Sequence, residues 1–230
     1  MLKAKVTENK PLTEDVFELT LKPEEPFTYK AGQYVTFKIA DAEPPCFRAY
    51  SLSSIPKEKA LQTCVKIVKN GRGSNWLKTR KPGDEIEFFG PNGDLTFQTP
   101  PEKKALFIAT GTGITPLKSI IAQQLQNGST QEIQLLFGLR HVKDIFYKEY
   151  FEKLTKKHKN FTFTLTLSQP ENPAWQGLQG RVTAHLENMD LDPQNTEIYI
   201  CGLKDMIESV TKILGQKGFA QSSVHFEKFD

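Results

Sequence analysis

The chain has 230 residues, of which 38% are hydrophobic and 25% are charged, a composition typical of a globular protein long enough for two small domains. Its formal net charge of +3 is too small to indicate a nucleic-acid-binding protein, and no apolar run reaches the ~20 residues that a membrane span requires. The three cysteines, Cys46, Cys64 and Cys201, are widely spaced, and neither they nor the four histidines have the spacing of a disulfide framework, an iron–sulfur site or another metal site. This spacing predicts that the protein has no metal site. The N-terminus lacks the apolar segment of a signal peptide, and together with the spacing of the cysteines this predicts a cytoplasmic protein.

The first 98 residues have the pattern of short strands separated by turns. Apolar and polar residues alternate in Val16–Leu21 and Val35–Ile39, which is typical of half-buried strands. Proline and glycine mark turns between such segments, as in Pro82-Gly83. The spacing predicts a six-stranded antiparallel β-barrel with one helix that begins near Ser74. The predicted strands are Leu2–Thr7, Val16–Leu21, Gln33–Ile39, Arg48–Ser53, Leu61–Val68 and Glu85–Phe89.

One predicted strand begins with the sequence Arg48-Ala49-Tyr50-Ser51. Because side chains alternate along a strand, Arg48 and Tyr50 share one face and Ser51 points to the other. An arginine offers a fork of donors to a phosphate, and a tyrosine offers a flat ring and a hydroxyl. The same pattern fits a solvated arginine beside a packed tyrosine.

A second candidate anion site follows in Gly71–Leu77. Glycines followed by Ser74-Asn75 can begin a short helix whose first N–H groups face outward, with Ser74 as a candidate N-cap. The alternative is a capped turn without a ligand. Two anion sites and an aromatic ring in one barrel fit a nucleotide-like cofactor.

A basic stretch surrounds this second candidate site. Between Lys66 and Gly83 the chain has six basic residues and no acidic one. The stretch is either a solvated face or a docking site for an acidic ligand or protein. The six residues are Lys66, Lys69, Arg72, Lys78, Arg80 and Lys81.

The pattern changes after a proline-containing linker at residues 99–104. From residue 105 to residue 230, apolar strand-like runs alternate with helical segments, which predicts an α/β domain with a parallel sheet covered on both faces. The predicted strands are Ala105–Ala109, Ile133–Phe137, Phe161–Leu167 and Thr196–Cys201, and the helices lie near 115–126, 144–158, 180–188 and 203–216.

The first of these strands ends in Thr110-Gly111-Thr112-Gly113, directly before a helical pattern with Pro116 in its first turn. Two glycines between a strand and a helix bring bare N–H groups to an anion, and the helix N-terminus adds partial positive charge. The third glycine of the dinucleotide fingerprint is absent, since Pro116 takes its place. Taken alone, the segment also fits an ordinary strand-to-helix turn.

Three further strand ends carry polar or glycine residues, in Gly138-Leu139-Arg140, Ser168-Gln169 and Cys201-Gly202. Ligands of open parallel sheets bind at the carboxyl ends of the strands. Four such ends along one edge favour a nucleotide site more strongly than one glycine turn does.

Through almost its whole length the chain resembles the ferredoxin–NADP reductase superfamily. The motifs that carry the resemblance follow one another in the family's order. They are Arg48-x-Tyr50-Ser51, Cys64-Val65-Lys66, Gly71-x-x-Ser74-Asn75-x-Leu77, Gly90-Pro91, Gly111-Thr112-Gly113-Ile114-x-Pro116, Gly138-x-Arg140, Cys201-Gly202-x-x-x-Met206 and Glu227-Lys228-Phe229. The resemblance implies a barrel that binds FAD, a second domain that binds NAD(P)H, and a reductase that transfers hydride between them.

The resemblance also implies roles for single residues. Ser51 would lie near flavin N5, Cys201 near nicotinamide C4, and Glu227 would be a charged or proton-relay group near the ring; these three are the candidate catalytic residues. The candidate FAD-binding residues are Arg48, Ala49, Tyr50, Ser51, Lys66, Val68, Gly73, Ser74 and Phe229. The candidate residues for the nicotinamide nucleotide are Thr110, Gly111, Thr112, Gly113, Pro116, Arg140, Ser168, Cys201, Gly202 and Met206.

The chain departs from plant-type members at two places. It has Phe229, followed by Asp230, where those members end in a tyrosine that shields the flavin. It has Gln169 after Ser168, where NADP-dependent members carry an arginine, and no Tyr-x-Gln follows. Arg140 or Lys143 could replace that arginine, but the pattern favours NADH over NADPH.

Because no iron–sulfur motif is present, the second electron carrier is expected to be a separate molecule. A basic rim near the flavin would attract a small acidic redox protein, either a ferredoxin or an oxygenase component. The alternatives are a stand-alone ferric or flavin reductase, and a flavin-binding regulatory subunit without turnover. A pyrimidine-pathway electron-transfer subunit is disfavoured, because its cysteine cluster is missing.

Overall fold

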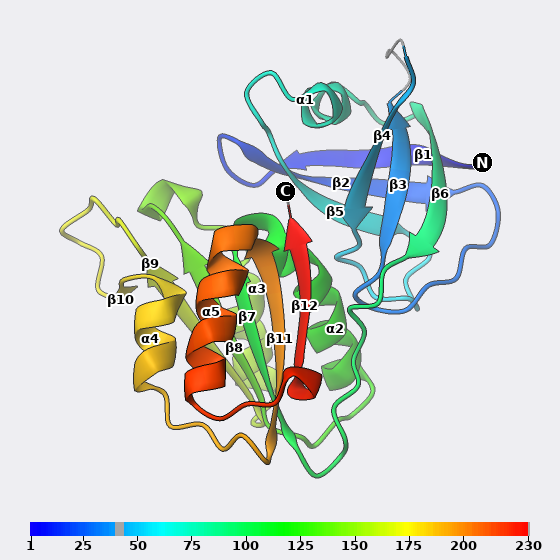
Figure 1. Cartoon of the computed structure of the whole chain (residues 1–230). Coiled ribbons are helices and arrows are strands. Elements are labelled where there is room, and N and C mark those ends of the chain that lie inside the picture. Colours follow the sequence, from blue (N-terminus) through cyan, green and yellow to red (C-terminus); the bar gives the residue numbers. More distant parts are fainter. Residues whose placement is uncertain (40–43, 230) are drawn as a thin grey trace. The chain divides into compact units, whose positions relative to one another are not determined.

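The computed structural model describes residues 1–39 and 44–229, so Asp230 lies outside the described residues. The chain divides into two compact units, residues 1–97 with 118–123 and residues 98–117 with 124–230 (Figure 1). The boundary at residues 97 and 98 lies next to the expected linker, and the domain bounds 1–98, 99–104 and 105–230 stay a prediction. Within the described residues, no helix is both long and apolar enough to cross a membrane.

The first unit is built on a six-stranded antiparallel sheet with the strand order β4-β3-β6-β1-β2-β5. Two hydrogen bonds join its two ends: Ser53 N–H donates to the Gln62 carbonyl at 2.7 Å, and Thr63 Oγ1 donates to the Ser51 carbonyl at 2.8 Å. The six expected strands are confirmed; β1, β2 and β6 are longer than expected, β3 and β5 are shorter, and β4 begins and ends two residues earlier. Their bounds are Leu2–Pro11 for β1, Val16–Pro23 for β2, Tyr34–Ile39 for β3, Cys46–Ser51 for β4, Leu61–Lys66 for β5 and Glu85–Asn92 for β6, and helix α1 is Arg72–Lys78.

The interior of this sheet explains why these segments become strands. Alternate residues of each strand, such as Leu19, Phe37 and Phe88, are fully buried in one core, and Trp76 and Leu77 of α1 join it. Each large side chain buried in this way stabilises the fold by roughly 1.5–3 kcal/mol. The alternation therefore fixes which face of β4 carries Arg48.

The second unit is a six-stranded sheet of parallel strands in the order β10-β9-β8-β7-β11-β12. Figure 1 shows α4 and α5 in front of this sheet and α3 behind it. The strands are Lys104–Thr110 (β7), Ile133–Leu139 (β8), Phe161–Leu167 (β9), Leu178–Gln179 (β10), Thr196–Leu203 (β11) and Val224–Phe229 (β12). The helices are Ile114–Gln126 (α2), Lys148–Lys157 (α3), Val182–Asn188 (α4) and Lys204–Gln216 (α5).

Two features of this unit differ from the sequence-based expectation. Helix α3 begins at Lys148 instead of residue 144, because Val142–Asp144 form a separate 3₁₀ turn and Tyr147 has φ of +59°, which interrupts a helix. The edge strands β10 and β12 were not expected. β12 matters for the site, because it carries Glu227 and Phe229.

The order of the strands defines where a ligand binds. From β7 the chain continues to β8 and β9 on one side, and it later returns to β11 and β12 on the other side. In such a sheet the connections leave adjacent strands in opposite directions, and ligands bind at the carboxyl ends of those two strands. In this chain the two strands are β7, which ends in Thr110, and β11, which contains Cys201-Gly202.

Candidate active site

Three of the residues expected to bind FAD meet in the first unit. Arg48 and Tyr50 of β4 lie opposite Phe37 and Val35 of β3, whose side chains face the core. A Cβ added to Gly73 would lie 2.8 Å from Arg48 Cγ and 3.0 Å from the Tyr50 hydroxyl. Glycine at the start of α1 therefore allows the helix backbone to approach both side chains.

The N-terminus of α1 is open toward an anion. Its N-cap, Gly71, makes no side-chain capping bond, and no acidic residue lies in the first turn. The expectation that Ser74 caps the helix is wrong, because the helix begins two residues earlier and Ser74 Oγ instead accepts from the N–H of Val68 at 3.0 Å. Asn75 Nδ2 donates to the carbonyls of Val68 and Gly71 at 2.8 and 2.7 Å. These bonds hold the loop while the first helical N–H groups remain available.

Tyr50 provides a rigid aromatic surface beside this helix end. One side of its ring lies against Phe37, with the centroids 5.6 Å apart. Burial raises the pKa of the Tyr50 hydroxyl to about 12, although the Arg48 guanidinium opposes the shift. The hydroxyl is therefore a neutral hydrogen-bonding group at physiological pH.

Ser51 lies at the end of β4 and is buried. The carbonyls that follow it are held by helix α2: Lys118 Nζ donates to the Ser53 carbonyl at 3.2 Å, and Ser119 Oγ donates to that of Ser54 at 2.5 Å. Lys118 is only 7% exposed, and burial lowers its pKa, against the opposing effect of the carboxylates of Glu18 and Glu58. We missed Lys118 in the sequence, because a lysine in a helical pattern indicates a solvent-facing position.

Three other expected FAD residues do not join this group through their side chains. Ala49 is exposed on the face of β4 opposite to Arg48 and Tyr50, so only its backbone could contact a ligand there. Lys66 pairs with Asp15 at 2.7 Å, and Val68 is 57% exposed. Their assignment to FAD stays a prediction.

In the second unit, the glycine turn after β7 meets the end of β11. A Cβ at position 113 would overlap the carbonyl group of Cys201 and lie 2.7 Å from the amide nitrogen of Gly202. In return, a Cβ on Gly202 would lie 2.5 Å from Thr110 Oγ1 and 2.6 Å from Met206 Cε. The expected nucleotide residues at these two strand ends are therefore in direct contact.

The turn itself is the start of the helix. Gly111–Gly113 form one 3₁₀ turn that leads into α2, with Gly111 at φ of +53°, and Thr115 Oγ1 donates to the Thr112 carbonyl at 2.6 Å. Pro116 lies in the first turn of α2, as expected, where a missing N–H removes no helical bond. The first N–H groups of this turn are suited to a phosphate.

Cys201 and Glu227 are neighbours in the sheet, since β11 and β12 pair Cys201 with Glu227 and Leu203 with Phe229. The Cys201 side chain is fully buried. Burial raises the pKa of its thiol well above the usual value, and the Glu227 carboxylate raises it further. The thiol is therefore protonated, and it can line a site but cannot act as a thiolate.

The last two expected nucleotide residues lie at the neighbouring strand ends of β8 and β9. Arg140 is exposed, and its Nε donates to Gln169 Oε1 at 3.0 Å. Backbone bonds hold the two segments together, from Gln169 N–H to the Arg140 carbonyl at 2.8 Å and from Ser168 N–H to the Leu139 carbonyl at 3.0 Å. A guanidinium thus lies beside Ser168 without an acidic partner in the part of the chain that the structure describes.

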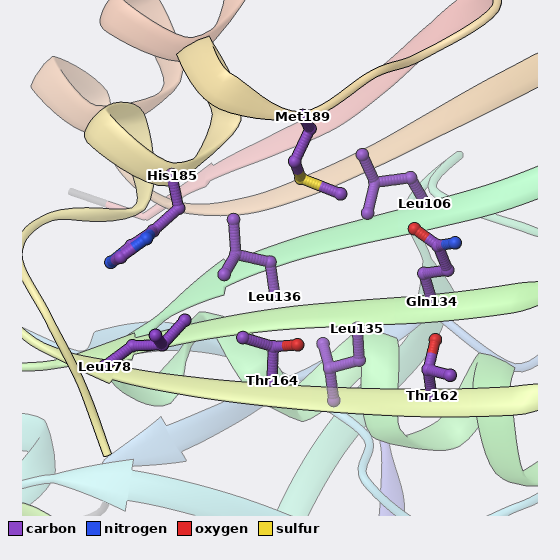
Figure 2. Close-up of a pocket in the computed structure, with 9 residues that line it drawn as sticks. All are labelled: Leu106, Gln134, Leu135, Leu136, Thr162, Thr164, Leu178, His185 and Met189. Atoms are coloured by element: carbon purple, nitrogen blue, oxygen red, sulfur yellow. The ribbon is translucent and has the colours of Figure 1, made fainter. Parts of the chain in front are cut away.

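A separate pocket of about 250 Å³ lies on the face of the sheet below α4 (Figure 2). Gln134, Thr162 and Thr164 project from β8 and β9 into it, and His185 and Met189 lie above them. The seven residues of α4 leave this part of the sheet uncovered, which accounts for threonines at positions where a covering helix would require apolar side chains. The pocket includes none of the expected site residues.

Comparison with known proteins gives the same division. Residues 3–97 match the oxidoreductase FAD-binding domain, and residues 107–212 match the oxidoreductase NAD-binding domain. Ferredoxin–NADP reductase B of Sorangium cellulosum is 32% identical over 238 residues, which cover 99% of this chain and 97% of that protein. The chain belongs to the ferredoxin–NADP reductase superfamily.

Two further members of the superfamily are longer than this chain. The reductase component DmpP of phenol 2-monooxygenase from Pseudomonas sp. strain CF600 is 30% identical, over 92% of this chain and 60% of its own length. The crystal structure of the Amycolatopsis cytochrome P450 reductase GcoB superposes with a TM-score of 0.90 at 28% identity, over 99% of this chain and 69% of GcoB.

Membership in the superfamily confirms the expected cofactors: the chain is an oxidoreductase that uses FAD and NAD(P)H. The residues present fit these groups. Arg48, Tyr50 and the open end of α1 offer donors and a flat ring to a dinucleotide flavin, and the missing side chain of Gly73 lets both side chains lie against this helix end.

The Gly73 contact generates the first prediction. Gly73→Ala should weaken FAD binding by about tenfold to a hundredfold, because overpacking of this kind costs about 1–3 kcal/mol and Arg48 and Tyr50 must move. The dissociation constant of FAD from apoprotein, measured by flavin fluorescence, is the readout. Gly215→Ala is the matched control, since a Cβ there meets open space in α5. Equal FAD affinity in the two variants would contradict the assignment.

The raised pKa of Cys201 generates the second prediction. Because only the thiolate reacts with iodoacetamide, alkylation of Cys201 in native protein should be slow at pH 8 and should accelerate only as the pH rises well above the usual thiol pKa. The same thiol in urea-unfolded protein should react at the rate of an ordinary cysteine. Peptide mass spectrometry locates the label, and fast native labelling at pH 7 would disprove the protonated, buried thiol.

Proposed function

We propose that this oxidoreductase takes hydride from NADH and passes the electrons one at a time to a small acidic redox protein. The names of two relatives support a protein acceptor: a ferredoxin–NADP reductase, matched over 97% of its length, and the reductase component of a phenol monooxygenase. A ferredoxin or an oxygenase component is therefore the expected class of partner.

Residues of the first unit hold the flavin in this proposal. Arg48 and the N–H groups at Gly73 and Ser74 bind the pyrophosphate of FAD, and Tyr50 packs against its ring system. Ser51 donates a hydrogen bond at flavin N5. When bound, FAD accepts two electrons as a hydride and releases them singly.

Residues of the second unit bind and orient the nicotinamide nucleotide. Thr112 and Gly113 contact the nucleotide with the N–H groups that begin α2. Cys201, protonated and buried, lines the nicotinamide position and sets distance and orientation without reacting itself. Glu227 places a carboxylate next to that thiol.

The choice of NADH over NADPH depends on the ends of β8 and β9. A 2′-phosphate needs cationic groups, whereas the ribose of NADH needs its hydroxyls satisfied. Ser168 is followed by Gln169, whose amide oxygen accepts from the Arg140 guanidinium at 3.0 Å. Position 169 therefore offers a neutral amide where NADP-dependent members offer a second cation, which supports NADH.

The acidic partner is supported by the charge around α1. Two of the six basic residues have acidic partners, since Lys66 pairs with Asp15 at 2.7 Å and Arg80 lies 3.9 Å from Asp84. The other four form no ion pair within the described residues. We call these four the basic surface; they are Lys69, Arg72, Lys78 and Lys81.

The basic surface adjoins the flavin site, because Arg72 directly precedes Gly73 in α1. Four unpaired cations attract an acidic protein over about a Debye length, ~10 Å at 0.1 M salt, and raise its association rate. The observation that carries the proposal is this uncompensated charge next to the flavin-binding residues.

Charge reversal tests the basic surface. The double variant Lys69→Glu, Lys81→Glu should reduce a small acidic [2Fe–2S] ferredoxin about tenfold more slowly at low salt, because steering is lost, and should match wild type near 0.5 M salt. Anaerobic reduction of the bound FAD by NADH should be unchanged. The matched control is Lys156→Glu, Lys159→Glu, which reverses two exposed lysines at the end of α3.

The same assays distinguish the alternative functions. Fast reduction of ferric chelate or free flavin, with slow and salt-independent reduction of ferredoxin, would show a stand-alone reductase. Bound FAD that no nicotinamide nucleotide reduces would show a regulatory subunit. Equal loss of ferredoxin reduction in the α3 control would remove the basic surface from the account.

A further inference from the structure

The C-terminal strand β12 is held in an unusual way for a strand that carries site residues. It is the edge strand of the second sheet and pairs only with β11. On one face of β12 Val224 packs against the core of the unit, but Phe226 is 46% exposed and Lys228 Nζ lies 5.4 Å from the centre of the Phe226 ring. Register is specified most strongly where one face of a strand is fully buried. The partly exposed β12 therefore depends on a further feature for its observed register.

That feature is a partly buried cluster of charged and polar side chains at the start of the strand. His225 Nε2 lies 3.0 Å from Glu197 Oε2, and Lys103 Nζ donates to Glu197 Oε1 at 2.8 Å. The side chains of Glu197 and His225 are only 9% and 18% exposed. A carboxylate in an otherwise apolar strand is costly unless it is paired, and both of its oxygens have partners here.

Ring stacking fixes the imidazole from its flat side. His225 stacks on Tyr199 with the centroids 4.9 Å apart, and Tyr199 stacks on Phe107 at 4.8 Å. The Tyr199 hydroxyl also accepts from the N–H of Gln98 at 2.8 Å. The ring of His225 is thus located by a hydrogen bond at its edge and by a stacked ring on its face.

The cluster and the site residues share one face of the sheet. Alternation puts His225, Glu227 and Phe229 of β12 on the same face, in register with Tyr199, Cys201 and Leu203 of β11. Backbone hydrogen bonds between strands do not distinguish one register from another. The bond from His225 to Glu197 does, since a slip of two residues would separate the two side chains.

We propose that Glu197 and His225, supported by Lys103, are positioning residues that fix the register of β12 and thereby place Glu227 beside Cys201. This inference rests on the proposed function, which assigns Cys201 and Glu227 to the nicotinamide site. Neither His225 nor Glu197 contacts the cofactors in this account; they act through the strand.

Two substitutions separate the hydrogen bond from the ring stack. His225→Phe keeps an aromatic ring on Tyr199 and removes the bond to Glu197, whereas His225→Gln keeps a donor for Glu197 and removes the ring. In the FAD-loaded enzyme, His225→Phe should lower kcat for NADH oxidation about tenfold to a hundredfold, the range expected when reacting groups are misplaced by about 1 Å. FAD content should stay that of wild type, and His225→Gln should recover part of the rate.

A second readout does not depend on activity. Because Cys201 is fully buried and pairs with Glu227 of β12, detachment of this strand should expose its thiol. Labelling with N-ethylmaleimide should increase at least about tenfold at Cys201 in His225→Phe, but not at Cys46 or Cys64, which are buried in the first unit. General destabilisation would increase labelling of all three. The control is Lys104→Met. Lys104 lies on β7, and the substitution removes its exposed ion pair with Glu132.

The outcomes are distinguishable. If wild type is active and His225→Phe matches it in kcat and in Cys201 labelling, the inference fails and the proposed function stands. If wild type does not oxidise NAD(P)H, the proposed function fails, and selective Cys201 labelling in His225→Phe still decides whether His225 holds the strand. If His225→Phe does not fold, His225→Gln decides. Labelling of Cys201 close to that of wild type would support the hydrogen bond to Glu197 as the contact that holds the strand, and selective labelling increased about tenfold would overturn it.

Discussion

Both candidate cofactor sites contain a place where the backbone comes so close to another group that only glycine fits. A Cβ at position 113 would overlap the carbonyl group of Cys201, and a Cβ at position 73 would lie 2.8 Å from Arg48 Cγ. Each glycine stands at the start of a helix, where N–H groups have no helical partner. The close packing places Arg48 and Tyr50 in the first unit, and the end of β11 in the second, beside N–H groups of the kind that bind a phosphate. Each unit thus holds one such glycine against a strand: Gly73 lies against β4 in the first unit, and Gly113 lies against β11 in the second.

Much of the fold could be predicted because burial leaves a periodic trace in the sequence. The alternation in β2 and β3, and the spacing of Ile114, Leu117 and Ile121 in α2, correspond to residues that are buried in the structure. β12 lacked this trace, since none of its residues is fully buried and one of the partly buried ones, His225, makes a polar contact. The start of α3 was misplaced because the left-handed backbone at Tyr147 has no counterpart in the hydrophobic pattern.

The candidate site was predictable where it depends on local order and unpredictable where it depends on distant partners. Arg48 and Tyr50 share a face because they are two residues apart in one strand. Lys118 binds the carbonyl of Ser53, 65 residues away, and Lys66 is neutralised by Asp15, 51 residues away. No pattern within one segment indicates such pairs. Sequence reasoning therefore overestimated the free charge near α1 and missed the buried lysine that binds the Ser53 carbonyl.

The central claim is that the chain binds FAD and that a bound nicotinamide nucleotide reduces it. An anaerobic titration of the purified, FAD-loaded protein, followed through the visible absorbance of the flavin, tests this claim most directly. The account predicts complete bleaching by one equivalent of NADH, with NADPH effective only at higher concentration. A protein that retains no flavin, or a bound flavin that stays oxidised with both nucleotides, would contradict it.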